Sequence, residues 1–302
     1  MAWALFINPI PAFIPKLFFS KKGFSLQSGL KDKVDYPFIK FLKIRISYSD
    51  FFYIYPINLK INIMKQSIVL LALFCFTISS AQKVKKITGS GIIKTITKTT
   101  AEYDKIKVTS SFSVKLVAGN EGNIKIEGDE NIIQYITTEV KNNELIVGFE
   151  KGYYIKYDYP STIDITIPFK KINTLSFSGS GSLTTTDVIT ADNLDVDCSG
   201  SGNVNFETSA NTVKITRGGS GSVIAKGKAT NLTVTSSGSG DINASQLTSA
   251  NVTATQTGSG NIKVNCTNNL SVTNSGSGSV NYKGSPKKVE KNSSGSGSIS
   301  GS

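Results

Sequence analysis

Residues 234–245 read VTSSGSGDINAS and place a Gly-Ser-Gly tripeptide between two short stretches in which polar and apolar residues alternate. The same tripeptide occurs six more times between residue 179 and the end of the chain, and the first glycines are spaced by 18 to 21 residues. The other copies are 179–181, 200–202, 219–221, 258–260, 276–278 and 295–297. A fixed period of this length is typical of a solenoid, in which each repeat is one coil.

Aligning the repeats on the first glycine brings apolar residues into four shared columns. Six before it stand Leu194, Val213, Leu232, Val252, Leu270 and Val289; four before it stand Val196, Ile215, Val234, Ala254 and Val272. Four after it stand Leu183, Val204, Val223, Ile242, Ile262, Val280 and Ile299; six after it stand Phe206, Ala225, Ala244, Val264 and Tyr282. The intervening positions are mostly polar, so each repeat reads as two short strands of about five residues with one apolar face.

Such a repeat cannot bury its apolar face alone. Stacking the coils in parallel register, about 4.8 Å apart, would bury a continuous core. No stretch in 172–302 has the apolar spacing of a helix. The sequence therefore predicts an all-β fold, a single-stranded parallel β-helix (β-solenoid) with regular Gly-Ser-Gly repeats.

The tripeptide is expected at the turn between the two strands, where glycine adopts a positive φ without steric cost. Three residues past the first glycine the side chain is always short and polar, and stacked copies are expected to hydrogen-bond one another and the turn. The middle serines, such as Ser220 and Ser239, are expected to form a similar ladder. A phosphate-binding loop is excluded because no Gly-rich motif here opens a helix or carries a Walker-type lysine. A flexible linker is excluded because strand-like segments separate all copies.

Residues 64–81, MKQSIVLLALFCFTISSA, have the features of a secretory signal peptide. Lys65 precedes a short apolar run, and small residues end at Ala81, so cleavage is expected before Gln82. The run is too short for a comfortable membrane span, and the bulky Phe74 before Cys75 argues against a lipid anchor. Since a signal peptide begins a protein, we interpret residues 1–63 as an over-extended upstream reading frame. The mature chain is expected to be exported to the periplasm, the cell surface or the medium, without a transmembrane helix.

The net charge of +12 does not indicate a nucleic-acid partner. Residues 1–63 hold nine Lys or Arg against three Asp, and residues 82–302 hold 23 basic and 18 acidic side chains. That mild excess is ordinary for a soluble surface.

Two cysteines follow residue 81, Cys198 and Cys266. They stand several coils apart, so the distance between their Cα atoms exceeds the roughly 7 Å that a disulfide permits. Both are predicted to be unpaired core thiols.

Residues 82–171 also alternate but lack the regular repeat, which predicts irregular coils that cap the N-terminal end of the regular coils 172–302. The one helical candidate is 130–136, with a cap near Asp129.

Three motifs stand in order before the remaining tripeptides: YDKIKVTSSFSVKL (103–116), IEGDENIIQYITTEV (126–140) and LSFSGSGSL (175–183). Together with GSG at 89–91, they resemble the bacterial "putative auto-transporter adhesin, head GIN domain" family over nearly all of 82–302. The resemblance implies a right-handed β-helix and an adhesin-like role, and it brings no catalytic, metal or cofactor residues.

Few side chains suggest chemistry, and the chain has no histidine, the commonest general base and metal ligand. Asp195 and Asp197 share an outward face, with Lys214 one coil away. Their columns continue as Thr, Ser and Asn, so we interpret them as a surface ion pair rather than a catalytic or calcium site. Arg217 is expected at a corner, where its side chain reaches solvent.

Two uncharged surfaces remain as alternatives. Aromatic residues in GYYIKYDYP (152–160) either stack on sugar rings or form a loop packed on the solenoid; they are Tyr153, Tyr154, Tyr157 and Tyr159. A flat hydroxyl array typical of ice-binding solenoids would be formed by Thr233, Thr235, Thr253, Thr255, Ser271 and Thr273.

The favoured hypothesis is an exported, non-enzymatic β-solenoid that binds a glycan, an envelope component or a protein, with no catalytic, cofactor-binding or metal residues and no nucleic-acid partner. One alternative is a carbohydrate-active β-helix enzyme, a polysaccharide lyase or hydrolase that uses Asp195 and Asp197. Another is a structural envelope protein that self-associates through a solenoid face or through its last coil near Ile299.

Overall fold

The computed structural model describes residues 17–20, 23–26, 85–156 and 162–302, in two units that divide after Ser80. In the first unit, β1 (Leu17–Ser20) and β2 (Gly23–Leu26) form an antiparallel hairpin. The predicted signal peptide and the rest of 1–63 lie outside the described residues. No helix in the described part of the chain is long and apolar enough to span a membrane.

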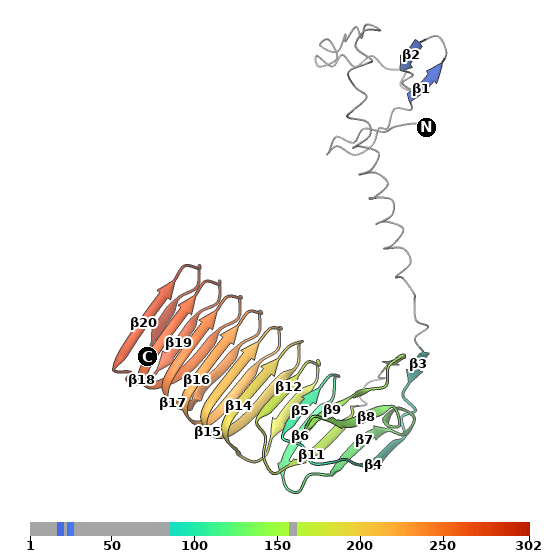
Figure 1. The fold of residues 1–302 in the computed structure, drawn as a ribbon, viewed down its shortest axis with the longest axis horizontal. Coiled ribbons are helices and arrows are strands. Elements are labelled where there is room, and N and C mark those ends of the chain that lie inside the picture. Colours follow the sequence, from blue (N-terminus) through green and yellow to red (C-terminus); the bar gives the residue numbers. More distant parts are fainter. Residues whose placement is uncertain (1–16, 21–22, 27–84, 157–161) are drawn as a thin grey trace. The chain divides into compact units, whose positions relative to one another are not determined.

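The second unit confirms the predicted fold class. It is all-β, with parallel coils stacked into a β-solenoid of about seven turns (Figure 1). The strands of the regular coils are β12 (Thr174–Phe177), β13 (Ser182–Thr185), β14 (Ile189–Cys198), β15 (Asn203–Arg217), β16 (Val223–Ser236), β17 (Ile242–Gln256), β18 (Ile262–Asn274), β19 (Val280–Lys283), β20 (Lys288–Ser293) and β21 (Ile299–Gly301).

The register of the strands follows the sequence columns. Val213 pairs with Leu232, Leu232 with Val252, and Val252 with Leu270, all in parallel. These side chains are buried, and they join the other columns in one continuous core. Parallel stacking in register is therefore set by the repeat itself.

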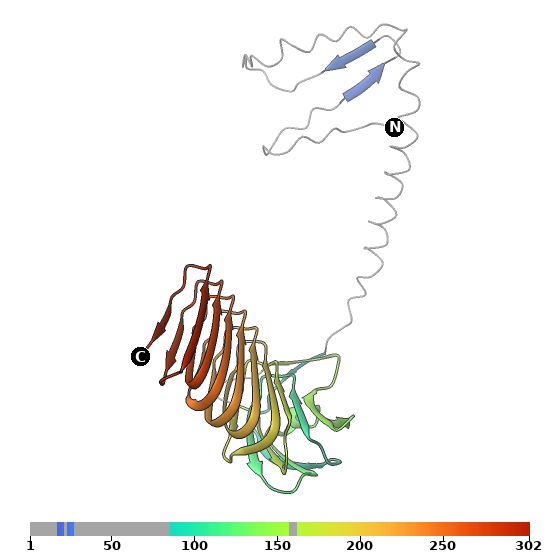
Figure 2. The same cartoon turned by 60° about the vertical axis from the view of Figure 1, so that its left-hand side comes forward.

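The strands are longer than two five-residue segments per coil. From β14 to β18, one strand runs through both halves of the coil and bends between them, as Figure 2 shows. In β15 the bend falls near Asn211, which has no register partner although Ala210 and Thr212 do. Each coil thus has a Gly-Ser-Gly turn at one edge and a strand bend at the other. We call the half after the turn the first sheet and the half before the next turn the second sheet.

The expected reason for the glycines was wrong. Among the seven tripeptides only Gly200 has a positive φ, 87°. A Cβ on Gly240 would instead lie 1.8 Å from the carbonyl oxygen of Gly221, one coil below, and a Cβ on Gly278 would lie 1.7 Å from that of Gly260. The glycines are needed because the turns of successive coils approach too closely for any side chain.

The side chains around the turn behave in two ways. Three residues past the first glycine, the predicted polar ladder is confirmed: Ser222 Oγ donates to Asn203 Oδ1 over 2.8 Å, and Asn261 Nδ2 donates to Asp241 Oδ1 over 3.1 Å. The middle serines are exposed, and backbone bonds such as Ser220 N–H to the Gly200 carbonyl (3.1 Å) join the coils there.

The N-terminal coils continue the same stack and then close it. The first regular turn, at 110–112, joins β5 (Lys105–Val108) to β6 (Ser113–Ala118), which pair with β12 and β13. On their other side lie β9 (Glu144–Phe149) and β11 (Asp164–Phe169), followed by antiparallel strands. The closing strands are β4 (Ile93–Thr99), β7 (Asn123–Asp129) and β8 (Ile136–Lys141), while β3 (Lys85–Thr88) pairs separately with β10 (Tyr153–Lys156).

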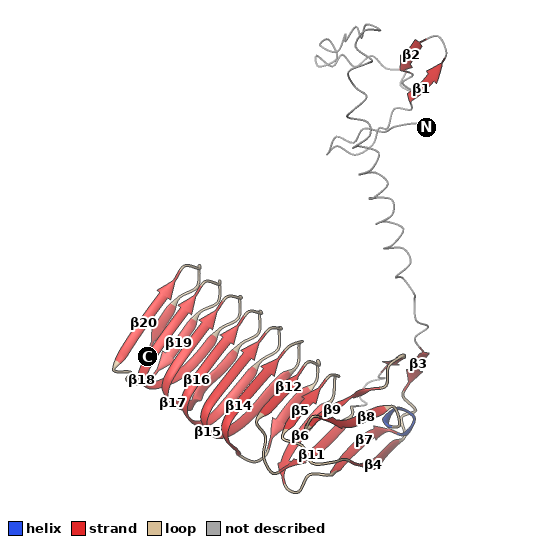
Figure 3. Cartoon of the chain, viewed as in Figure 1, coloured by secondary structure: helices blue, strands red, loops and turns tan. Residues whose placement is uncertain are grey.

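The predicted helix is shorter than expected: α2 (Glu130–Ile133) is one turn (Figure 3). Asp129 occupies its N-cap position without a side-chain cap hydrogen bond. Its carboxylate instead accepts a hydrogen bond of 2.6 Å from the Gly91 N–H. The carboxylate therefore ties the first Gly-Ser-Gly, at 89–91, to the core.

Cys198 and Cys266, the cysteines within the described residues, are free and buried, as predicted. Burial raises the pKa of the Cys198 thiol to about 12, against the opposing effect of Arg217 beside it. Neither cysteine has the exposed, low-pKa environment of a reactive thiol.

Candidate binding groove

Two open cavities lie on the outer face of the second sheet, next to the bend. The first cavity, of about 540 Å³, lies toward the N-terminal coils, and its lining includes Lys171, Asn193 and Lys214. The second, of about 420 Å³, lies farther along the solenoid, and its lining includes Asn231, Asn251 and Glu290. Both cavities use the same two outward columns, and the strand register joins Thr212 of the first to Asn231 of the second. The columns of this surface, which we call the bend groove, are Asn193, Thr212, Asn231, Asn251, Asn269 and Lys288, and Asp195, Lys214, Thr233, Thr253, Ser271 and Glu290.

The first column contains a ladder of asparagine amides that the sequence analysis missed. Asn251 Nδ2 donates to Asn231 Oδ1 over 2.9 Å, and Asn269 Nδ2 donates to Asn251 Oδ1 over 2.7 Å. The signal was present, because asparagine recurs seven positions before the first glycine of its repeat. An amide has two N–H donors and two acceptor lone pairs. The ladder fixes each amide in place while leaving hydrogen-bonding capacity for a ligand.

The second column contains the predicted ion pair of Asp195 and Lys214. Lys214 Nζ lies 3.1 Å from Asp195 Oδ2, with both side chains about half exposed, so the surface ion pair is confirmed. Asp197 is exposed one column farther from the bend and pairs in register with Thr216. Among the described residues no group of three acidic, thiol or imidazole side chains is placed to hold a metal ion.

The predicted hydroxyl array lies beside the asparagine column, and two of its members, Thr253 and Ser271, line the second cavity. Thr233, Thr253 and Ser271 are in register in the second column, and Thr235, Thr255 and Thr273 are in register in the next outward column. The array therefore adjoins the asparagine ladder instead of forming an isolated flat face.

Arg217 does not reach solvent, which corrects the expectation for this residue. Its side chain is fully buried inside the coil, where Nε donates to the Gly221 carbonyl (3.1 Å) and Nη2 donates to the Gly200 carbonyl (2.9 Å). Burial lowers the pKa of its guanidinium. The column faces inward, and a long side chain there can reach turn carbonyls: the Gly200 carbonyl also accepts from the Ser220 N–H, whereas the guanidinium supplies the hydrogen bond of the Gly221 carbonyl.

The same inward column supports other turns. Gln256 Nε2 donates to the Gly260 carbonyl, and Asn274 Nδ2 donates to the Gly278 carbonyl over 2.9 Å. In each case the side chain bonds to a glycine four residues later. Arg217 is thus one member of a buried column that holds the turns, and it is not a ligand contact.

The tyrosines do not form one stacking platform in the described residues. Tyr153 packs against Tyr135, with ring centroids 4.4 Å apart, whereas the neighbouring Tyr154 is 60% exposed. Tyr157 and Tyr159 lie outside the described residues. The groove is therefore the stronger candidate for recognition.

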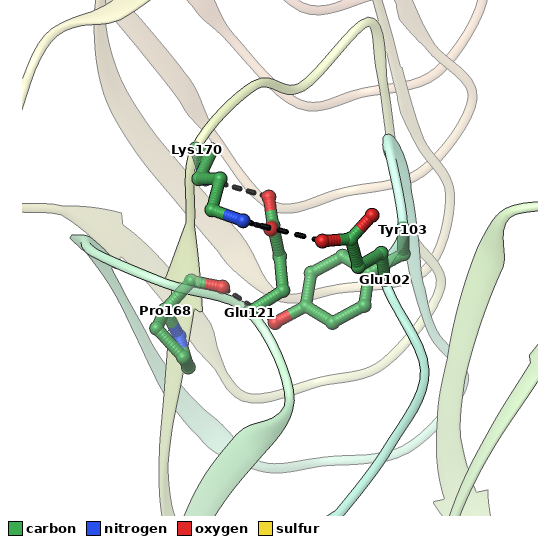
Figure 4. Close-up of polar contacts among 5 residues, drawn as sticks. All are labelled: Glu102, Tyr103, Glu121, Pro168 and Lys170. Carbon is green, nitrogen blue, oxygen red and sulfur yellow. Dashed lines mark hydrogen bonds and ion pairs between the residues drawn. The ribbon is translucent and has the colours of Figure 1, made fainter.

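A charged cluster lies beside the N-terminal end of the groove (Figure 4). Lys170 Nζ lies 3.3 Å from both Glu102 Oε1 and Glu121 Oε2, and the Lys170 N–H donates to Glu121 Oε1 over 2.8 Å. These residues line a cavity of about 280 Å³ that shares Lys171 with the bend groove. Tyr103 lies beneath them and donates to the Pro168 carbonyl. Burial, with the charge of Glu121, raises the pKa of Tyr103.

Replacing Glu121 with glutamine is expected to flatten the acid limb of the stability profile. Burial acts to raise the pKa of Glu121, but hydrogen bonds and the charge of Lys170 leave it below its usual value of 4.5. The stabilisation is therefore fully present above that pH and is lost as the pH falls through the folded pKa. Urea unfolding between about pH 5 and pH 3 should show a steeper loss in the wild type. Parallel profiles for the two proteins would show that the cluster contributes nothing.

A search of the curated proteins finds no match, but solved structures share this architecture. A crystal structure of a "putative adhesin" from Bacteroides fragilis is 28% identical, with a TM-score of 0.68, over 72% of this chain and all of the other.

Two further solved structures share the fold. A "putative lipid binding protein" from Parabacteroides distasonis is 24% identical, with a TM-score of 0.60, over 72% of this chain and all of the other. A "putative adhesin" from Parabacteroides merdae is 21% identical, with a TM-score of 0.60, over 72% of this chain and 99% of the other.

The sequence motifs also match a family model. The model covers residues 102–286, more than half of the chain, from the segment just before β5 through six of the seven regular tripeptides. The chain therefore belongs to the family described as "putative auto-transporter adhesin, head GIN domain".

Proposed function

We propose that the protein is an exported, non-enzymatic binding module whose bend groove holds a linear glycan. The observation that supports this is the amide ladder of Asn231, Asn251 and Asn269 within an open groove. Membership of a family named for adhesins agrees with a binding role at the cell surface.

The chemistry of the groove suits sugar hydroxyls. Each asparagine amide can donate and accept at once, which matches a pair of adjacent hydroxyl groups. The methyl groups of Thr233 and Thr253 offer small apolar contacts beside them. Successive coils are about 4.8 Å apart, similar to the length of one sugar in an extended chain, so a linear glycan can place one sugar on each coil.

Replacing Asn251 with alanine should weaken glycan binding more than it weakens the fold. Asn251 bonds both neighbouring amides, so its loss frees the orientation of the whole ladder. We expect the dissociation constant to rise about tenfold, since hydrogen bonds contribute about 1 kcal/mol each. A glycan array should identify the ligand, and calorimetric titration should measure the change.

The matched control is Asn205→Ala, an outward asparagine on the first sheet. It should leave binding unchanged. An array without any bound glycan would overturn the proposal. So would a lyase or hydrolase activity that disappears in Asp195→Ala and Asp197→Ala variants, which would support the enzyme alternative.

The last coil has features that oppose self-association. All residues of β20 are exposed, and Val289 is 40% exposed where its column partner Leu270 is buried. However, Lys291 occupies an inward position, opposite Val272, and its ammonium lies 4.8 Å from the centre of the Tyr282 ring. A charged side chain that points inward on an edge strand blocks further pairing.

Replacing Lys291 with valine is therefore expected to promote association of solenoid ends. The variant restores an apolar column on an open strand edge, and such edges template pairing. Sedimentation velocity over a range of concentrations should show a larger species in the variant than in the wild type. Lys288→Val, at an outward position, is the control and should sediment as the wild type does. Self-association of the wild type would favour the structural alternative.

A further inference from the structure

The basic residues of the solenoid are concentrated in its C-terminal half. Residues 208–302 hold nine Lys or Arg and only two acidic residues, Asp241 and Glu290. Residues 82–207, by contrast, hold 14 basic and 16 acidic residues. The nine are Lys214, Arg217, Lys226, Lys228, Lys263, Lys283, Lys287, Lys288 and Lys291.

Four of these lysines share one surface. Lys228, Lys263 and Lys283 are exposed on the first sheet, and Lys226 is partly exposed two residues before Lys228. The register carries the column of Lys228 through Thr248 and Asn265 to Lys283. Three coils separate the two lysines, or roughly 14 Å at about 4.8 Å per coil. We call these four side chains the basic face.

The charges of the basic face are not neutralised by neighbours. None of the four lysines forms an ion pair within the described residues, whereas Lys214 and Lys288 do. Their columns continue as Asn, Gln and Thr, and the one acidic neighbour is Glu207, in register with Lys226. A surface of one sign attracts a partner of the opposite sign.

We infer that the basic face binds a linear, carboxylate-bearing polysaccharide lying along the solenoid axis. The lysines lie on β16, β18 and β19, three of four consecutive coils, in the direction that such a chain would follow. A membrane surface fits less well, because the face has no exposed aromatic side chain and its one exposed large aliphatic residue is Ile224, at 36%. Single-stranded nucleic acid fits less well because the face has no aromatic side chain on which bases could stack.

This site is separate from the bend groove, which lies on the second sheet, and the inference does not depend on the proposed function. The two also differ in their response to salt. Binding at the basic face should weaken as ionic strength rises, because exposed charges are screened. Hydrogen bonding of a neutral glycan in the bend groove should change little.

The test measures binding of the purified protein to polygalacturonate by biolayer interferometry at low and at elevated salt. A K226Q/K228Q/K263Q/K283Q variant should bind at least about tenfold more weakly than the wild type. The reason is that a field of one sign raises the local concentration of an oppositely charged ligand by about that factor or more. A K85Q/K86Q/K105Q/K107Q variant removes the same charge from the N-terminal strands and should bind as the wild type does. Circular dichroism checks that both variants fold.

Each other result would overturn the inference. Absence of binding to polygalacturonate at low salt would do so directly. An equal loss in both variants would mean that only net charge matters. Tighter binding to phosphatidylglycerol vesicles or to single-stranded DNA would assign the face to another class of partner. Loss of binding in Asn251→Ala would move the polysaccharide to the bend groove.

Discussion

Replacing Gly240 with alanine is expected to destabilise the solenoid by about 3 kcal/mol or more, because overpacking against a backbone that cannot move is costly. The new Cβ would lie 1.8 Å from the Gly221 carbonyl oxygen. The neighbouring coils would have to separate, which would break backbone hydrogen bonds at the turn. Thermal unfolding should show a melting temperature lower by about 6–12 °C.

Ser239→Ala is the matched control, because Ser239 is exposed in the same turn. It should change the melting temperature by no more than a degree or so, as exposed substitutions usually do. A Gly240→Ala variant as stable as Ser239→Ala would show that the turns do not approach as closely as described.

Replacing Arg217 with alanine is expected to cost about 3 kcal/mol, since it removes the donor to the Gly221 carbonyl, weakens the bonding of the Gly200 carbonyl, which keeps the Ser220 N–H, and opens a cavity. The Gly221 and Gly200 carbonyls would lose their donors from the guanidinium. Arg217→Gln should be at least as stable as the wild type. Gln256 makes the corresponding bond to Gly260 in the same column, and the substitution removes a buried charge that has no carboxylate partner.

Denaturant unfolding of the two Arg217 variants therefore distinguishes two roles. If the side chain acts by supporting the turn, glutamine substitutes for it and alanine does not. Equal stability of the two variants would contradict that role. A large loss in Arg217→Gln alone would indicate that the positive charge itself is required.

The regular coils could be predicted because each column repeats. Val213, Leu232 and Val252 specify the register without knowledge of any distant contact, and the observed pairs follow it. The reason for the glycines could not be read in the same way. Sequence alone shows that glycine is required, and only the distance between stacked turns shows that close approach is the cause.

The remaining errors have a similar origin. Arg217 stands in an inward column, but an arginine was expected to reach solvent because burial of a charge is costly. The carbonyls that accept its hydrogen bonds belong to turns whose geometry the sequence does not give. The asparagine ladder depends on bonds between Asn231, Asn251 and Asn269, which are spaced by 18 to 20 residues. The columns were visible, but the depth of the groove depends on the strand bend, which the repeat pattern does not specify.

Dependence of affinity on ligand length tests the central claim most directly. Calorimetric titration with oligosaccharides of increasing length, from the glycan found on an array, should give an affinity that rises with each sugar until the groove columns are filled. The gain should vanish in Asn251→Ala and persist in Asn205→Ala. An affinity that does not depend on length, or a gain that survives Asn251→Ala, would contradict a binding site extended along the coils.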